Sequence, residues 1–118
     1  MPIGLKRAYD PPAAGDGYRV LVDRVWPRGI TKDALKLDAW LKDLAPSTAL
    51  RQWFGHDPER WNAFRERYFR ELDGHGPALE ELARRAGQCQ VTLVFAASDA
   101  ERNNAVALKE YLKRRRRR

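Results

Sequence analysis

Five polar residues lie at the ends of the two most apolar runs of this sequence or shortly after them, and their side-chain types suit the binding of an anion. They are Asp23, Arg24, Arg28, Ser98 and Asn103. Guanidinium groups form paired hydrogen bonds with phosphate and carboxylate, and free amides at the start of a helix hold the same groups. A carboxylate among them can orient an arginine or act as a base. The set therefore predicts a site for a small anion such as a nucleotide or a phosphorylated metabolite.

The same residues allow a second interpretation that is purely structural. Asp23 and Arg24 could belong to a buried ion-pair network that only fixes the loops, and such a network would look equally polar in the sequence. No residue is identified as a nucleophile, because Ser98 is the one positioned hydroxyl and no base is evident beside it. The sequence leaves open whether a ligand would only be bound or also converted.

The other reactive side chains are not expected beside this set. His56 and His75 lie in glycine-flanked connections, and the place of His56 next to a helix cap favours a structural role. Cys89, the single cysteine, precedes the last apolar run and is expected to be a buried or inert thiol at the opposite end of the sheet. No residues have the spacing of a zinc site, so neither a metal nor a cofactor is predicted.

Two buried strands are expected to position the five polar residues. Residues 18–25 and residues 90–97 are nearly continuous apolar runs rich in valine, a pattern typical of strands buried on both faces. Ligands of open α/β sheets bind outside the carboxyl ends of the strands. Because the five polar residues follow these two strands, we expect them around one concavity at one edge of the sheet.

The remaining segments complete an alternation of strands and helices. Residues 3–9 predict a first strand, and only about eight residues join it to the next, whereas a parallel crossover needs a dozen or more. These two strands are therefore either antiparallel neighbours or not neighbours at all. Residues 37–45 fit a helix and a strand equally well. Helices are predicted over residues 31–34, 46–54, 58–72, 77–85 and from 103 or 104 to 112.

The whole pattern predicts a single layered α/β domain with a mostly parallel central sheet of about four strands flanked by helices. A length of 118 residues suits one domain, and 43% hydrophobic residues can fill one core. We assign this domain to residues 1–113. No run has the length of a signal peptide or a membrane span, and the single cysteine suits a reducing compartment, so a cytoplasmic protein without membrane contact is predicted.

The basic charge is concentrated at the end of the chain. Residues 114–118 are all arginine, and the net charge of +7 falls to +2 without them. Five adjacent arginines repel one another and have nothing apolar to bury, so a disordered basic tail is expected. The alternative function is a nucleic-acid-associated protein that uses this tail with Arg65, Arg67 and Arg70, although acidic residues among these three favour an ordinary solvated face. A structural or partner-binding module is a third alternative.

Several segments resemble the hallmark segments of the YeaO-like family of small bacterial proteins. They are residues 6–11 (KRAYDP), 17–29 (GYRVLVDRVWPRG), 44–47 (LAPS), 54–58 (FGHDP) and 103–105 (NNA). The resemblance extends over residues 3–113 and is specific. It implies a Rossmann-like α/β fold in which residues 37–45 form a third strand, in a family whose function is itself unknown.

The chain departs from the family and its relatives at two places. Family members often carry a basic residue in the loop after the last strand, where this chain has Ser98, and this weakens an anion site in that loop. More distant relatives place a cysteine and a Cys-His-Arg run where this chain has Phe95 and residues 103–105. The resemblance therefore implies no thiol or metal chemistry at these positions.

Overall fold

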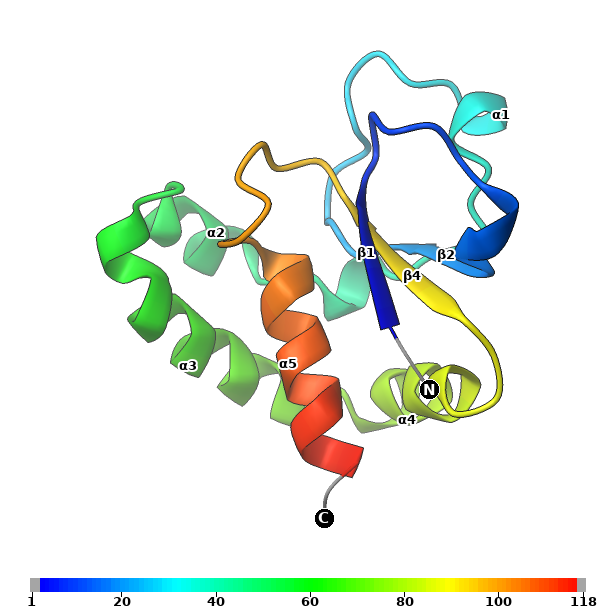
Figure 1. The fold of residues 1–118 in the computed structure, drawn as a ribbon. Coiled ribbons are helices and arrows are strands. Elements are labelled where there is room, and N and C mark those ends of the chain that lie inside the picture. The colour runs from blue at the N-terminus through cyan, green and yellow to red at the C-terminus, as the bar shows by residue number, and fades with distance from the viewer. Residues whose placement is uncertain (1–2, 117–118) are drawn as a thin grey trace.

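The computed structural model describes residues 3–116, in which strands alternate with helices (Figure 1). The strands are β1 (Ile3–Arg7), β2 (Tyr18–Leu21), β3 (Ala39–Trp40) and β4 (Val91–Phe95). The helices are α1 (Lys32–Leu35), α2 (Thr48–Phe54), α3 (Trp61–Asp73), α4 (Gly76–Ala86) and α5 (Asn104–Arg116). None of these helices is long and apolar enough to cross a membrane.

Within residues 3–116 the strands form one parallel sheet in the order β1-β4-β2-β3. Both β1 and β2 pair with β4, so the first two strands are not neighbours, which is one of the two expected alternatives. The α/β class and the Rossmann-like parallel sheet are thereby confirmed. Since all strands run the same way, their carboxyl ends meet at one edge, where the segments that follow β2 and β4 lie next to each other.

Each face of the sheet buries its own hydrophobic cluster. Val20 and Leu93 belong to the larger cluster, which includes side chains from α2 to α5. Leu21 and Val94 point to the other face, where they pack with Leu35 of α1. Figure 1 shows α2 to α5 gathered on one side, with α1 apart from them. The continuous apolar runs predicted in the sequence are thus explained, because both strand faces are covered.

Helix α2 ends at Phe54, where the sequence predicts, and begins at Thr48, two residues after the predicted start. The Ser47 hydroxyl caps it by accepting a hydrogen bond of 3.1 Å from the backbone N–H of Leu50, and Gly55 ends it with φ of 53°. The same Ser47 hydroxyl donates to a carboxylate oxygen of Glu71 at 2.6 Å, which joins α2 to α3. The predicted helix over residues 58–72 begins instead as a 3₁₀ turn and becomes α-helical at Trp61.

A buried arginine of β2 forms an ion pair and also hydrogen-bonds to the end of α1 on the second face of the sheet. Arg19 is 4% exposed, and its guanidinium donates to the Asp16 carboxylate at 2.7 Å and to the backbone oxygen of Leu35 at 2.8 Å. Lys6 contacts the same carboxylate at 2.8 Å. The Arg19 guanidinium thus satisfies carbonyl groups at the end of α1, which have no partner within that helix.

One expectation needs correction. The third strand implied over residues 37–45 is only two residues long, Ala39–Trp40, and is followed by a 3₁₀ turn over Lys42–Leu44. Helix α5 extends through residue 116 and so includes the start of the expected tail, whose disorder stays a prediction. Arg114 pairs with Glu110 at 2.7 Å and Arg115 with Glu80 at 3.6 Å. Residues 117 and 118 lie outside the described residues.

Candidate functional site

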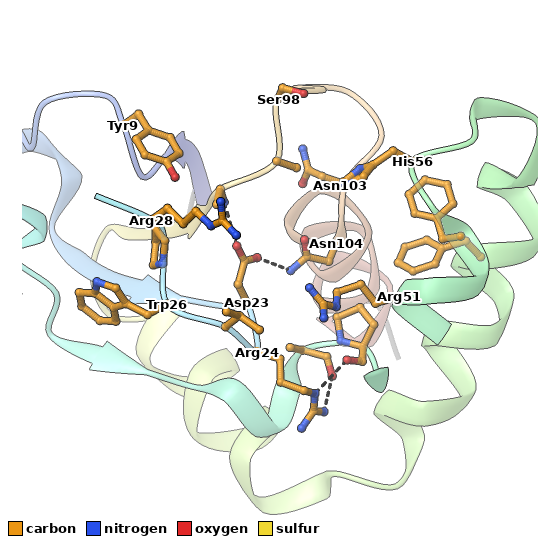
Figure 2. A pocket seen from close by; sticks show the side chains of 18 residues that line it. Tyr9, Asp23, Arg24, Trp26, Arg28, Arg51, His56, Ser98, Asn103 and Asn104 are labelled. Atoms are coloured by element: carbon orange, nitrogen blue, oxygen red, sulfur yellow. Dashed lines mark hydrogen bonds between the residues drawn. The ribbon is translucent and has the colours of Figure 1, made fainter. Parts of the chain in front are cut away.

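A pocket of about 460 Å³ opens at the carboxyl edge of the sheet. Its walls come from the segments that follow β1, β2 and β4 and from residues 45–56, which are distant in the sequence (Figure 2). Its volume is in the range typical of small-molecule sites. The structure brings all of the predicted site residues to this pocket: Asp23, Arg24, Arg28, Ser98 and Asn103.

The Asp23 carboxylate is held by groups from two other segments of the chain. Its Oδ2 accepts from the backbone N–H of Ala96 at 2.8 Å, and its Oδ1 accepts from Nδ2 of Asn104 at 3.0 Å. Burial raises the pKa of Asp23, while the hydrogen bonds from Asn104 and Ala96 and the positive charges of Arg51 and His56 oppose this rise. Asp23 thus links the ends of β2 and β4 with the first turn of α5.

Two guanidinium groups in the pocket have no hydrogen-bond or ion-pair partner in the described part of the chain. Arg28 follows β2 and Arg51 belongs to α2, and neither side chain forms a hydrogen bond or an ion pair within residues 3–116. Figure 2 shows them on opposite sides of Asp23. Both side chains are exposed. They are therefore free to form charge-assisted hydrogen bonds with an anion.

Arg24 lines the pocket, and two of its three guanidinium nitrogens donate hydrogen bonds to the backbone. Its Nε donates to the backbone oxygen of Pro46 at 3.2 Å and its Nη2 to that of Ala45 at 3.2 Å. Its Nη1 has no hydrogen bond within residues 3–116, so a contact of Arg24 with an anion stays a prediction. No ion pair joins Asp23 to any arginine in the described part of the chain, so neither the expected Asp23–Arg24 network nor an arginine oriented by Asp23 is seen. Arg24 instead fixes the segment that leads into α2.

Asn103 and Ser98 line the pocket in different ways. Asn103 is 2% exposed and caps α5, because its Oδ1 accepts from the backbone N–H of Val106 at 2.9 Å and its Nδ2 donates to the backbone oxygen of Asp99 at 2.8 Å. Ser98 is exposed at the mouth of the pocket, and its hydroxyl has no hydrogen-bond partner among residues 3–116. Of the two residues at which the last helix was expected to begin, Asn103 or Asn104, Asn103 is the cap.

Sequence reasoning missed Arg51, His56 and Asn104. His56 was expected away from Asp23, yet both line the same pocket. Gly55 and His56 adopt consecutive left-handed conformations, with φ of 53° and 58°, and this turn brings the chain back to the pocket after α2. A left-handed residue other than glycine is uncommon and is found often at functional sites. Gly55 in the sequence signals the turn, although it does not show where the following side chain lies.

Apolar side chains surround the mouth of the pocket. Within residues 3–116 the exposed large hydrophobic residues are Tyr9, 46% exposed, and Val25, 54% exposed, and both line it. Trp26 also lines the pocket, but its indole N–H donates to the backbone oxygen of Ile30 at 2.8 Å and its ring packs edge-on against Trp40. An apolar rim around cationic groups suits a ligand that has both an anionic and a less polar part.

The described residues contain no group of three or more His, Cys, Asp or Glu side chains that could hold a metal ion. Cys89 lies before β4, at the opposite end of the sheet from the pocket, as expected. Its thiol is exposed, however, and contacts the backbone oxygen of Arg85 at 3.4 Å. Of the two expected alternatives, a buried or an inert thiol, the buried one is therefore wrong.

Comparison with known proteins finds relatives along nearly the whole chain. The uncharacterized protein YeaO of Escherichia coli is 43% identical over 113 residues, which cover 96% of this chain and 98% of that protein. The uncharacterized protein Rv3073c of Mycobacterium tuberculosis is 43% identical over 110 residues, which cover 93% of this chain and 92% of that protein. No solved structure gives a significant match. A family profile described as the inactive DUF488-N3 subclade matches residues 2–118, so the chain belongs to this YeaO-like family of unknown function.

Proposed function

We propose that this protein is a small cytoplasmic binding domain that holds an anionic ligand, such as a nucleotide or a phosphorylated metabolite, in the pocket at the carboxyl edge of the sheet. The observation that carries the proposal is the pair of partnerless guanidinium groups, Arg28 and Arg51, on opposite sides of one cavity. Arginine forks match the geometry of phosphate and carboxylate oxygens. A free, exposed Cys89 suits the reducing cytoplasm.

Binding without a chemical step is the better supported role. The Ser98 hydroxyl, which lines the pocket, has no base hydrogen-bonded to it within residues 3–116. The family description calls this subclade inactive, which agrees with such a site. Arg28 and Arg51 would hold the anion, while Arg24 and Asn103 would position the walls of the pocket.

The nucleic-acid alternative has weaker support from the helix arginines. Arg65 pairs with Glu110, with 2.5 Å between Nη2 and the carboxylate, and Arg67 lies over the ring of Trp53 at 4.0 Å. These contacts occupy two of the three side chains that would have to face phosphates. Arg114 also pairs with Glu110.

A thermal-shift comparison tests the proposal. Nucleotides, phosphorylated compounds and oligonucleotides are each added to the wild-type protein, to the double variant Arg28→Ala/Arg51→Ala, and to Arg84→Ala as a control. Arg84 is an exposed arginine of α4 that does not line the pocket. A ligand at a hundred times its Kd stabilises the folded state by about 2.7 kcal/mol, which is readily seen as a rise in Tm.

The expected result is that a small phosphorylated compound raises the Tm of the wild type and of Arg84→Ala, whereas it has no effect on the double variant. Stabilisation by oligonucleotides alone would favour the nucleic-acid alternative. An equal response of the double variant would contradict binding at Arg28 and Arg51.

A further inference from the structure

We propose that the ligand of this pocket carries hydroxyl groups next to its phosphate, and that these hydroxyls donate hydrogen bonds to Asp23 and Asn104 while the phosphate pairs with the guanidinium group of Arg28 or Arg51. This inference rests on the proposed function and specifies the ligand class. It follows from the division of the pocket into hydrogen-bond acceptors near Asp23 and donors on either side of it.

The side-chain amide of Asn104 has one orientation that its surroundings permit. Its nitrogen lies 2.8 Å from the backbone oxygen of Val22 and 3.0 Å from Oδ1 of Asp23. Both partners are acceptors, so this atom must be the NH₂ group, and both of its hydrogens are used. In Figure 2 the nitrogen turns toward Asp23 and the oxygen turns away from it.

The Asn104 amide oxygen is consequently an acceptor without a partner among the described residues. It has Asp23 beside it, whose two carboxylate oxygens each accept one hydrogen bond and retain further lone pairs. Both residues line the pocket. Together they present several acceptor sites, and the two groups have no free hydrogen to donate.

The donors lie on either side of these acceptors. Arg28 and Arg51 offer N–H groups from opposite sides, and Arg51 and His56 both act electrostatically on Asp23. A phosphate group placed directly on Asp23 would be repelled by its carboxylate, because like charges in partly buried surroundings repel strongly. A neutral hydroxyl has no such penalty and can donate to either acceptor. A ligand with a phosphate and adjacent hydroxyls can therefore accept hydrogen bonds from the arginines and donate them to Asp23 and Asn104.

The test compares glycerol phosphate with propyl phosphate, which have three carbons and one phosphate each and differ in their hydroxyl groups. Dissociation constants are measured by NMR titration of the ¹⁵N-labelled wild-type protein, a method that also records weak binding. A hydrogen bond to a charged group contributes roughly 1.5–3 kcal/mol, so we expect glycerol phosphate to bind at least about ten-fold more tightly. The side-chain NH₂ signals of Asn104 should shift with glycerol phosphate and stay in place with propyl phosphate.

A pair of variants separates the effect of the Asp23 carboxylate from the effect of the net charge of the protein. Asp23→Asn should bind propyl phosphate more tightly and lose the preference for glycerol phosphate, while Asp43→Asn, which changes an exposed aspartate outside the pocket, should keep both constants. If Asp23→Asn does not fold, the comparison of the two compounds on the wild type decides alone.

The outcomes distinguish this inference from the proposed function. Equal binding of both compounds, abolished by Arg28→Ala/Arg51→Ala, would overturn the role of the hydroxyls and leave the anion site standing. If neither compound binds and no other phosphorylated compound does, the anion site itself is refuted and the inference falls with it.

Discussion

The Asp23 carboxylate accepts a hydrogen bond of 3.0 Å from Nδ2 of Asn104, a residue 81 positions further along the chain. The same nitrogen donates to the backbone oxygen of Val22 at 2.8 Å. These contacts fasten the start of α5 to the end of β2, and the N–H of Ala96 adds the end of β4. The pocket therefore depends on side chains that also hold three elements of the fold together.

Replacing Asn104 should test this structural role directly. In Asn104→Ala, the backbone oxygen of Val22 and Oδ1 of Asp23 each lose a donor, and a partly buried group left without its partner costs about 1–3 kcal/mol. We expect the free energy of unfolding in urea to fall by that amount. Gln88→Ala changes an exposed polar residue outside the pocket and serves as the control, with an expected change within about 0.5 kcal/mol. Equal effects of the two substitutions would show that the Asn104 contacts contribute nothing.

Asp23 should make the protein less stable as the pH rises. Burial raises its pKa in the folded state, so the folded protein keeps this proton to a higher pH than the unfolded chain does. The contribution is fully present below the unfolded pKa of about 3.9 and is lost as the pH rises through the folded pKa. The unfolding free energy of the wild type minus that of Asp23→Asn should decrease over this window. A difference that increases with pH would show that the folded pKa is lowered instead.

The contribution of Asp16 to stability should change with pH in the opposite direction. Desolvation acts to raise its pKa, but hydrogen bonds from Lys6, the backbone of Ala13 and Arg19 outweigh desolvation and lower it. Its contribution is present above the unfolded pKa of about 3.9 and is lost as the pH falls through the folded pKa. Urea unfolding of Asp16→Asn over the same pH series should therefore lack part of the acid-induced loss seen in the wild type. An unchanged acid profile would contradict the importance of this ion pair.

The sequence predicts those strands and helix ends that depend on neighbouring residues. The valine-rich runs predict β2 and β4, and Ser47 and Gly55 mark the ends of α2, because capping and strand burial depend on neighbouring residues. The strand-end rule then brings the five predicted residues to one pocket without knowledge of the strand order.

The pocket residues that the sequence does not predict are those that depend on the position of α2 at the edge of the sheet. Arg51 and His56 line the same pocket as the segments that follow β2 and β4, a tertiary relationship that no local pattern encodes. The hydrogen bonds of Arg24 are not predicted for a similar reason, since their carbonyl acceptors at residues 45 and 46 lie about twenty positions away. Guanidinium groups look alike in a sequence, whether they are free or hydrogen-bonded to the backbone.

His56 offers a way to separate backbone strain from ligand binding. Its φ of 58° is unfavourable for most side chains, by roughly 1–2 kcal/mol, and glycine avoids this cost. We expect His56→Gly to unfold at an equal or higher urea concentration than the wild type, and β-branched His56→Val to be destabilised by about 1 kcal/mol or more. If His56 also contacts the anion, both variants should bind glycerol phosphate less tightly. A more stable Val variant would contradict the left-handed conformation.

Removal of residues 114–118 should separate the charge of the arginines from the pocket. The truncation loses the surface pairs of Arg114 with Glu110 and Arg115 with Glu80, and each such pair contributes about 0–1 kcal/mol, so the fold should remain intact by circular dichroism. Oligonucleotide binding, followed by fluorescence anisotropy, should weaken and depend less steeply on salt because fewer counterions are released. Binding of glycerol phosphate should not change. If oligonucleotide affinity survives the truncation and falls in Arg28→Ala/Arg51→Ala instead, the nucleic acid occupies the pocket, and the assignment of a small ligand must be withdrawn.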